Sequence, residues 1–111
     1  MTEVTVAGPA GENVQVIDKT DERYYELRVD GVFAAVLVYE VIGSRRILTH
    51  AIVEEVYRGR GLATQLVRAA LDDIRAQYMT VTNYCTLVDH FISENPVQDL
   101  IDPEHPGIKH G

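Results

Sequence analysis

Hydrophobic and polar positions alternate along the first half of the chain, and this alternation predicts β-strands. Residues 25–29 alternate apolar and charged side chains, the two-residue period of a strand with one face in water. The Asp30-Gly31 pair that follows is a strong hairpin signal, so residues 32–42 are expected to return antiparallel. Further strands are expected over residues 14–17 and 45–53, which gives a meander of about four antiparallel strands.

The spacing of the hydrophobic positions changes after residue 61. Between residues 62 and 76 the apolar positions follow the spacing of one helical face, which predicts an amphipathic helix. Residues 78–84 are rich in β-branched and aromatic side chains and predict a strand, so the strand-helix-strand order implies a parallel crossover. A short helix is expected over residues 86–93 with Thr86 as its N-cap, and one more helical turn over residues 97–101.

These elements predict an α/β (α+β) fold: an antiparallel meander, a helix crossover to a parallel strand, and a short C-terminal helix. Residues 13–102 form the expected single domain. Residues 1–12, with the breakers Gly8-Pro9-Ala10-Gly11, are interpreted as a flexible lead-in before the fold begins. Residues 103–111 show no periodicity and are expected to form a flexible tail.

Composition limits the function. A chain of 111 residues with a formal charge of -7 is expected to be one domain and not to have nucleic acid or an anionic membrane as its main partner. It has no apolar run of about 18 residues and no signal-peptide pattern, so we expect a cytoplasmic protein. The single cysteine, Cys85, agrees with a reducing compartment. The four histidines lack metal-ligand spacing, and no metal site is predicted.

The segment over residues 53–63 carries the clearest candidate chemistry. It passes from a β-branched strand through Gly59 and Gly61 into the predicted helix, with Arg58 and Arg60 beside the glycines. Glycine lets backbone N–H groups approach a ligand closely, and a helix N-terminus adds unpaired donors and partial positive charge. The segment therefore predicts a phosphate or pyrophosphate site, with an ordinary strand-to-helix connection as the alternative.

A family resemblance starts from this turn. The letters R-G-R-G-L-A at residues 58–63 fit the R-x-x-G-x-A pattern of the GCN5-related N-acetyltransferases (GNAT). The chain is similar to small YjdJ-like members of that family over about residues 23–101. The ordered features that carry this similarity are Tyr24-Tyr25, Asp30-Gly31, Thr49-His50, the glycine turn, Cys85, Phe91-Ile92, Asn95-Pro96 and Asp99-Leu100.

The resemblance implies acetyl-CoA, or CoA, as the ligand and acetyl-CoA as the acyl donor. Its pyrophosphate would lie on the backbone of residues 58–63, with the pantetheine arm between the strand ends near Val53 and Tyr84 and the thioester close to Cys85. The implied cofactor-binding residues are Val53, Arg58, Gly59, Arg60, Gly61, Leu62, Ala63, Tyr84 and Cys85.

Cys85 is the implied catalytic residue, either as a nucleophile that accepts the acetyl group or as an acid that protonates the departing CoA thiolate. A buried core cysteine is the alternative. The general base is unassigned, because Ile52 stands where relatives commonly have a glutamate. His50 is one candidate and Glu54 or Glu55 acting through a water is another, while a hydrogen bond within the sheet is the alternative role for His50.

The resemblance therefore implies an acetyl-CoA-dependent N-acetyltransferase that acts on an unidentified primary amine. Only residues 18–22 join the first two expected strands, where typical members insert helices, so the acceptor side is expected to be open to a protein or peptide. The chain is expected to be a monomer or a weak dimer. Two alternatives remain: a CoA-binding module with little or no transferase activity, acting as a sensor or interaction domain, and a structural domain that keeps the turn only as part of its fold.

Overall fold

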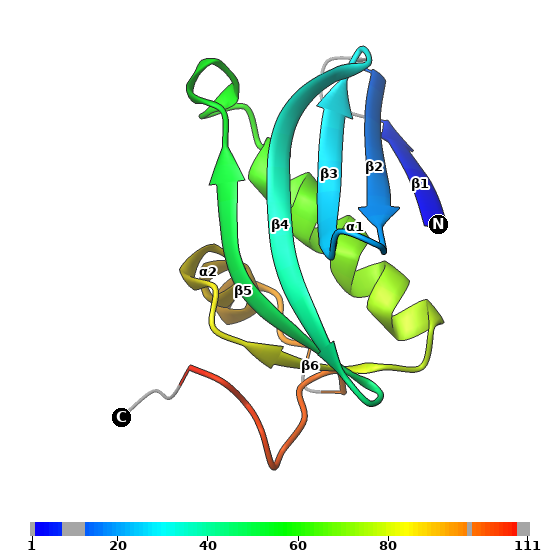
Figure 1. Cartoon of the computed structure of the whole chain (residues 1–111). Helices are drawn as coiled ribbons and strands as arrows, with labels where there is room; N and C mark the ends of the chain where they lie inside the picture. Colours follow the sequence, from blue (N-terminus) through cyan, green and yellow to red (C-terminus); the bar gives the residue numbers. More distant parts are fainter. Residues whose placement is uncertain (1, 8–12, 98, 109–111) are drawn as a thin grey trace.

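The protein consists of one mixed sheet with two α-helices, seen in a computed structural model that describes residues 2–7, 13–97 and 99–108 (Figure 1). The strands are β1 (Thr2–Ala7), β2 (Asn13–Lys19), β3 (Tyr24–Val29), β4 (Val32–Ile42), β5 (Arg45–Val53) and β6 (Thr80–Asn83). The helices are the short 3-10 helix η2 (Glu55–Tyr57), α1 (Leu62–Ala76) and α2 (Thr86–Glu94). In the described part of the chain, no helix is both long and apolar enough to cross a membrane.

The six strands lie in the sheet in chain order. Strands β1 to β5 pair antiparallel with their neighbours, and β6 pairs parallel with β5 after the α1 crossover. The predicted α/β (α+β) class, the Asp30-Gly31 hairpin and the parallel crossover are confirmed. The helix predicted over residues 62–76 also has the observed bounds, because a strongly amphipathic segment buries its apolar face in only one way.

The sheet has one antiparallel strand more than predicted. Thr2–Ala7 form β1, whose register with β2 runs from Thr2 opposite Asp18 to Ala7 opposite Asn13. The expectation that the fold begins only after residue 12 is therefore wrong. An edge strand gains its hydrogen bonds from the neighbouring strand, so the breakers that follow it in sequence do not prevent its pairing. Residues 8–12 lie outside the described residues.

Helices α1 and α2 cover the same face of the sheet, and α1 crosses behind the antiparallel strands (Figure 1). The apolar side of α1 includes the fully buried Leu66 and Ile74, which join the same core as Leu27 and Leu37 of the sheet. Complete burial of each such side chain contributes about 1.5–3 kcal/mol. This core fixes α1, and with it the turn that precedes the helix.

A buried polar cluster supports the other end of α1. Arg46 of β5 donates a hydrogen bond to Asp18 over 3.0 Å, and its guanidinium lies 4.5 Å from the ring centroid of Tyr39. The Tyr25 hydroxyl donates to Asp73 of α1 over 2.8 Å. Burial raises the pKa of both tyrosines, so their hydroxyls remain protonated donors. The cluster therefore connects the C-terminal half of α1 to four strands, β2 to β5.

Two predicted boundaries need correction. Strand β6 is shorter than residues 78–84 because Tyr78 has a positive φ of 58° and belongs to the turn after α1. Helix α2 has Cys85, not Thr86, as its N-cap residue. The extra helical turn predicted over residues 97–101 is a single hydrogen-bonded turn, in which the Leu100 N–H donates to the Val97 carbonyl oxygen. No further helix follows α2 in the described residues.

The C-terminal segment runs beside β6. Isolated bridges join Val81 to Ile101 and Asn83 to Gly107. The expected flexible tail is therefore wrong for residues 103–108, while residues 109–111 lie outside the described part. The contacts are made mainly by backbone groups, which need no hydrophobic period in the sequence.

Candidate functional site

Strands β5 and β6 separate partway along the sheet, and this separation creates the site. Their parallel register ends with Leu48 opposite Asn83, and the Tyr84 N–H donates to the Leu48 carbonyl oxygen over 2.8 Å. Beyond that bond β5 continues to Val53, whereas the segment after β6 turns into α2 (Figure 1). The edge of β5 over residues 49–53 thus has no strand beside it among the described residues, and its backbone groups face the gap.

A β-bulge lies at the start of this free edge. Val38 of β4 is opposite His50 and Tyr39 is opposite Leu48, so Thr49 is the extra residue of β5. The Thr49 hydroxyl donates to the Val38 carbonyl oxygen over 3.1 Å. Ala51 lies opposite Leu37 of the core. The bulge therefore shifts the alternation of side chains along β5, so that Ala51 lies on the inner face of the sheet.

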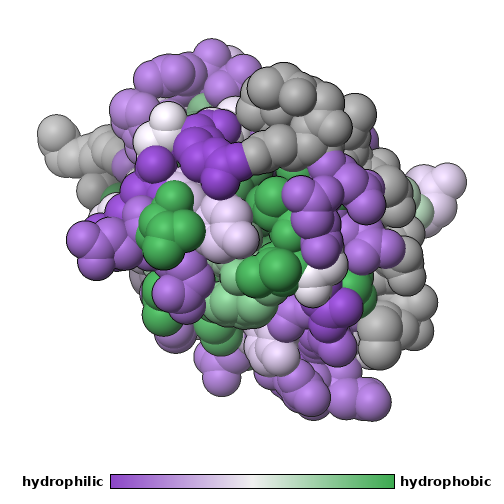
Figure 2. Space-filling model, turned by 90° about the horizontal axis from the view of Figure 1, so that it is seen from above, coloured by the Kyte–Doolittle hydropathy of each residue, from purple (hydrophilic) through white to green (hydrophobic). Residues whose placement is uncertain are grey.

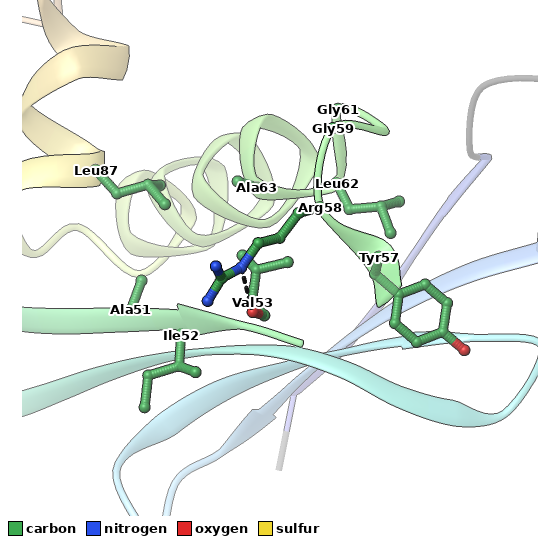
Figure 3. Close-up of a pocket in the computed structure, with 10 residues that line it drawn as sticks. All are labelled: Ala51, Ile52, Val53, Tyr57, Arg58, Gly59, Gly61, Leu62, Ala63 and Leu87. Carbon is green, nitrogen blue, oxygen red and sulfur yellow. Dashed lines mark hydrogen bonds between the residues drawn. The ribbon is translucent and has the colours of Figure 1, made fainter. Parts of the chain in front are cut away.

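A cavity of about 430 Å³ fills the gap between the free edge of β5 and the helices. Figure 3 shows its walls, which come from the end of β5, the glycine turn, the first turn of α1 and Leu87 of α2. Seen from above, this end of the molecule shows apolar residues gathered in the middle with hydrophilic residues beside them (Figure 2). The lining residues are Ala51, Ile52, Val53, Tyr57, Arg58, Gly59, Gly61, Leu62, Ala63 and Leu87.

The glycine turn requires its glycines for backbone conformation. Gly59 and Gly61 have φ values of 78° and 74°, and an added Cβ would meet nothing within 4 Å at either position. Gly61 is the N-cap residue of α1, and its carbonyl accepts the first intrahelical bond, from the Gln65 N–H, over 3.3 Å. The N–H groups of residues 62–64 precede that bond and remain available to an anion.

The side chains of the two arginines in the turn make different contacts. Arg58 extends across the cavity, and its Nε donates to the Val53 carbonyl oxygen over 3.2 Å (Figure 3). The Arg60 guanidinium lies 5.4 Å from the ring centroid of Tyr57, and Arg60 is not a lining residue. Arg58 is therefore the cationic side chain that the cavity presents, whereas the sequence alone did not distinguish the two.

Cys85 lies at the end of β6, as expected, but its side chain is 3 % exposed and belongs to the core. It is not among the cavity-lining residues, although Leu87, two residues later, is. Tyr84 is more than half exposed and also does not line the cavity. The structure thus places the thiol after the end of β6 and buries it in the core, outside the cavity lining.

The candidate bases lie outside the cavity. His50 is exposed, with its Nδ1 3.2 Å from the Thr49 hydroxyl, on the side of β5 opposite to Ala51. Glu54 and Glu55 are exposed and follow the strand. Tyr57 and Arg58 are the titratable side chains that line the cavity, while Ile52, 52 % exposed, occupies the wall. Among the described residues, no group of three or more His, Cys, Asp and Glu could hold a metal ion.

Six of the nine residues expected to bind the cofactor line this cavity. They are Val53, Arg58, Gly59, Gly61, Leu62 and Ala63. Ala51 was not expected, although its position two residues before Val53 places it on the same strand face. Tyr57 was also not expected, although it lies within the segment 53–63 next to Arg58. Leu87 was not expected either, and local sequence carries no signal for it, because only the crossover brings α2 and the turn to one gap.

Comparison with known proteins shows the family of the chain. Residues 24–100 match the family model described as GCN5-related N-acetyl-transferase. Protein NATD1 of Gallus gallus is 33% identical over 95 residues, which cover 84% of this chain and 86% of that protein. Protein NATD1 of Mus musculus is 32% identical over 98 residues, covering 86% and 89% of the two chains.

A solved structure gives an independent comparison of the fold. The crystal structure of the ribosomal-protein-S18-alanine N-acetyltransferase from Escherichia coli aligns with a TM-score of 0.51 and 23% identity. The alignment covers 56% of this chain and only 42% of that one, so it supports the shared fold alone. The family-model match spans most of the chain, and the chain belongs to the GCN5-related N-acetyltransferase family.

Proposed function

We propose that the protein binds acetyl-CoA in the cavity beside β5 and transfers the acetyl group to a primary amine. The observation that carries this proposal is the cavity itself: a free strand edge forms one wall and a glycine turn at a helix N-terminus closes one end. Acetyl-CoA would supply the activated acyl group as a thioester. The ordered sequence features also support a place among the small YjdJ-like members of the family.

The residues present suit this ligand. The free N–H groups at the start of α1 and the guanidinium of Arg58 would bind the pyrophosphate. The edge of β5 over residues 49–52, which pairs with no strand on this side, offers backbone donors and acceptors to the amides of the pantetheine arm. Val53 and Leu87 supply apolar surface for its methylene groups.

We propose a protein or peptide as the acceptor. Strands β2 and β3 are joined only by the turn over residues 20–23, in which Lys19 accepts hydrogen bonds from the N–H groups of Glu22 and Arg23. No helix is present between those strands to enclose a small metabolite. The net charge of -7 also favours the approach of a cationic amine.

For Cys85, the packing favours one of the two chemical roles. The side chain is 3 % exposed within the core, so a covalently attached acetyl group would need additional volume there. Donating a proton to the departing thiolate needs no such volume. We therefore propose Cys85 as the acid, with replacement by alanine and by serine as its test: equal turnover in both variants and the unmodified protein would reject this role.

A CoA-binding module without significant transfer is the second candidate. Its support is that the cavity wall contains no histidine or carboxylate, and Ile52 is present where a base would be useful. Such a module would bind acetyl-CoA and CoA but release no thiol in the presence of amines. A thiol-release assay over a panel of amines and peptides separates the two candidates.

Calorimetry with acetyl-CoA tests the binding step that both candidates share. Gly61→Ala places a Cβ at a left-handed position in the turn, so we expect binding to weaken at least tenfold. Gly43→Ala is the matched control, since Gly43 has a similar φ of 61° with open space around it, in the hairpin between β4 and β5. No measurable binding by the unmodified protein would exclude both candidates.

A further inference from the structure

Asn83 is a buried polar residue at the end of β6, and both polar atoms of its side chain form hydrogen bonds with the backbone of Cys85. Its Oδ1 accepts the Cys85 N–H over 2.9 Å, and its Nδ2 donates to the Cys85 carbonyl oxygen over 3.1 Å. Asn83 is 3 % exposed. Because Cys85 is the N-cap residue of α2, this side chain fixes the backbone from which α2 begins.

The main chain of Asn83 is held from the other side by the C-terminal segment. Its N–H donates to the Pro106 carbonyl oxygen over 3.2 Å, and its carbonyl oxygen accepts the Ile108 N–H over 2.7 Å. A Cβ on Gly107 would lie 2.0 Å from that carbonyl oxygen, and Gly107 has a φ of 94°. Only glycine permits this approach.

Further bonds extend the contact along β6, and we name residues 101–108 the C-terminal strap. The Asp102 N–H donates to the Val81 carbonyl oxygen over 3.0 Å. The Thr82 hydroxyl donates to the His105 carbonyl oxygen over 2.5 Å. The strap is therefore continuous from the middle of β6 to its last residue.

We propose that Asn83 is a positioning residue for acetyl transfer, and that the C-terminal strap keeps it in place. Through Cys85 it sets the start of α2, and α2 carries Leu87 in the cavity wall. Four polar groups of one buried residue are thus committed to joining the strap to the start of α2. The role in transfer rests on the proposed function, whereas the hold on Cys85 is testable without it.

Thiol labelling measures the hold on Cys85 directly, because the chain has no other cysteine. Gly107→Ala is expected to displace the strap and to raise the rate of iodoacetamide labelling at least tenfold over the unmodified protein. Gly43→Ala is the matched control, with a positive φ but no atom within 4 Å of the added Cβ. Equal labelling rates in the two variants would overturn the inference.

Kinetics measure the positioning role. Asn83→Ala is expected to lower kcat about tenfold, because it removes both side-chain hydrogen bonds that hold the Cys85 backbone. The Kd for CoA should change less than threefold, because the glycine turn and β5, which make most of the cavity wall, are untouched. Asn83→Asp keeps an acceptor for the Cys85 N–H and is expected to restore part of kcat. A fall in kcat and in CoA affinity together, or no fall in kcat, would contradict positioning.

A stability control separates positioning from general damage. Tyr39→Phe removes a buried hydrogen bond to Asp18 in the polar cluster, away from the cavity-lining residues, and is expected to lower the melting temperature without changing kcat. An equal loss of kcat in Tyr39→Phe and Asn83→Ala would overturn the proposal. If the unmodified protein transfers no acetyl group, the proposed function fails, and the labelling comparison alone then decides whether the strap holds Cys85.

Discussion

The Nε of Arg58 donates a hydrogen bond to the carbonyl oxygen of Val53, 3.2 Å away, and so ties the glycine turn to the end of β5. This bond leaves the two terminal nitrogens of the guanidinium inside the cavity (Figure 3). Arg58 therefore both shapes the turn and presents a positive charge where we propose that the pyrophosphate binds.

Replacing Arg58 should accordingly cost more than replacing Arg60. We expect Arg58→Ala to weaken binding of acetyl-CoA about tenfold, which corresponds to about 1.4 kcal/mol. Arg60→Ala should change the Kd less than threefold, because Arg60 packs on Tyr57 and does not line the cavity. Calorimetry on both variants decides the matter, and equal losses would show that the arginines act only through overall charge.

The buried cluster around Arg46 should govern stability. Arg46→Met would leave Asp18 and Asp73 buried without their shared cation, and breaking a buried pair in this way costs about 3–5 kcal/mol. Urea unfolding measures this loss. Arg75→Ala is the comparison, because its pair with Asp99 is exposed to solvent and should contribute little. A similar midpoint for both variants would contradict the importance of the cluster.

Acid should loosen the C-terminal strap. The backbone N–H of Glu104 holds the pKa of Asp102 below its ordinary value of 3.8, with smaller help from His105 and Arg45. A lowered folded-state pKa means that this carboxylate stabilises the strap fully above about pH 4, and that the contribution is lost as the pH falls through the folded value.

Amide NMR signals of Val81 and Asn83 report the strap, because both residues bond to it. We expect these signals to shift between pH 5 and pH 2.5 before global unfolding. In Asp102→Asn they should already be shifted at pH 5 and should change little on further acidification. A full pH response in Asp102→Asn would assign the effect to another carboxylate, with Asp99 as the first alternative because Arg75 also lowers its pKa.

The sequence predicted those elements whose pattern is local. The α1 helix and the Asp30-Gly31 hairpin follow from side-chain periodicity and turn preference within a few residues. Strand β1 and the strap were missed, since both depend on backbone pairing with strands that lie elsewhere in the chain. Pairing with a distant strand can order a segment whose own sequence has no periodic pattern of hydrophobic residues.

The site was predictable to a similar extent. The glycine turn could be located because positive φ values favour glycine, and Gly59 and Gly61 both have them. The burial of Cys85 could not be read in this way, because it depends on how α2 packs against α1. The different orientations of Arg58 and Arg60 likewise depend on the carbonyl of Val53 and the ring of Tyr57.

Ile52 provides a test of what limits turnover. It borders the cavity, and its side chain is 52 % exposed on the side of β5 opposite to Ala51 (Figure 3), so a carboxylate at this position would lie at the rim of the cavity without being buried. If transfer is limited by deprotonation of the acceptor amine, Ile52→Glu should raise kcat at neutral pH at least tenfold, since a positioned general base typically contributes about 10²–10⁴-fold.

Ile52→Gln is the matched control for that experiment, because glutamine has nearly the same shape as glutamate but cannot act as a base. A gain in Ile52→Glu alone, lost as the pH falls through the pKa of the new carboxylate, would identify amine deprotonation as the limiting step. Equal rates in both variants would show that the acceptor amine loses its proton elsewhere, and His50 would then be the next residue to replace. Acetyl-CoA binding without turnover in either variant would favour the binding module over the transferase.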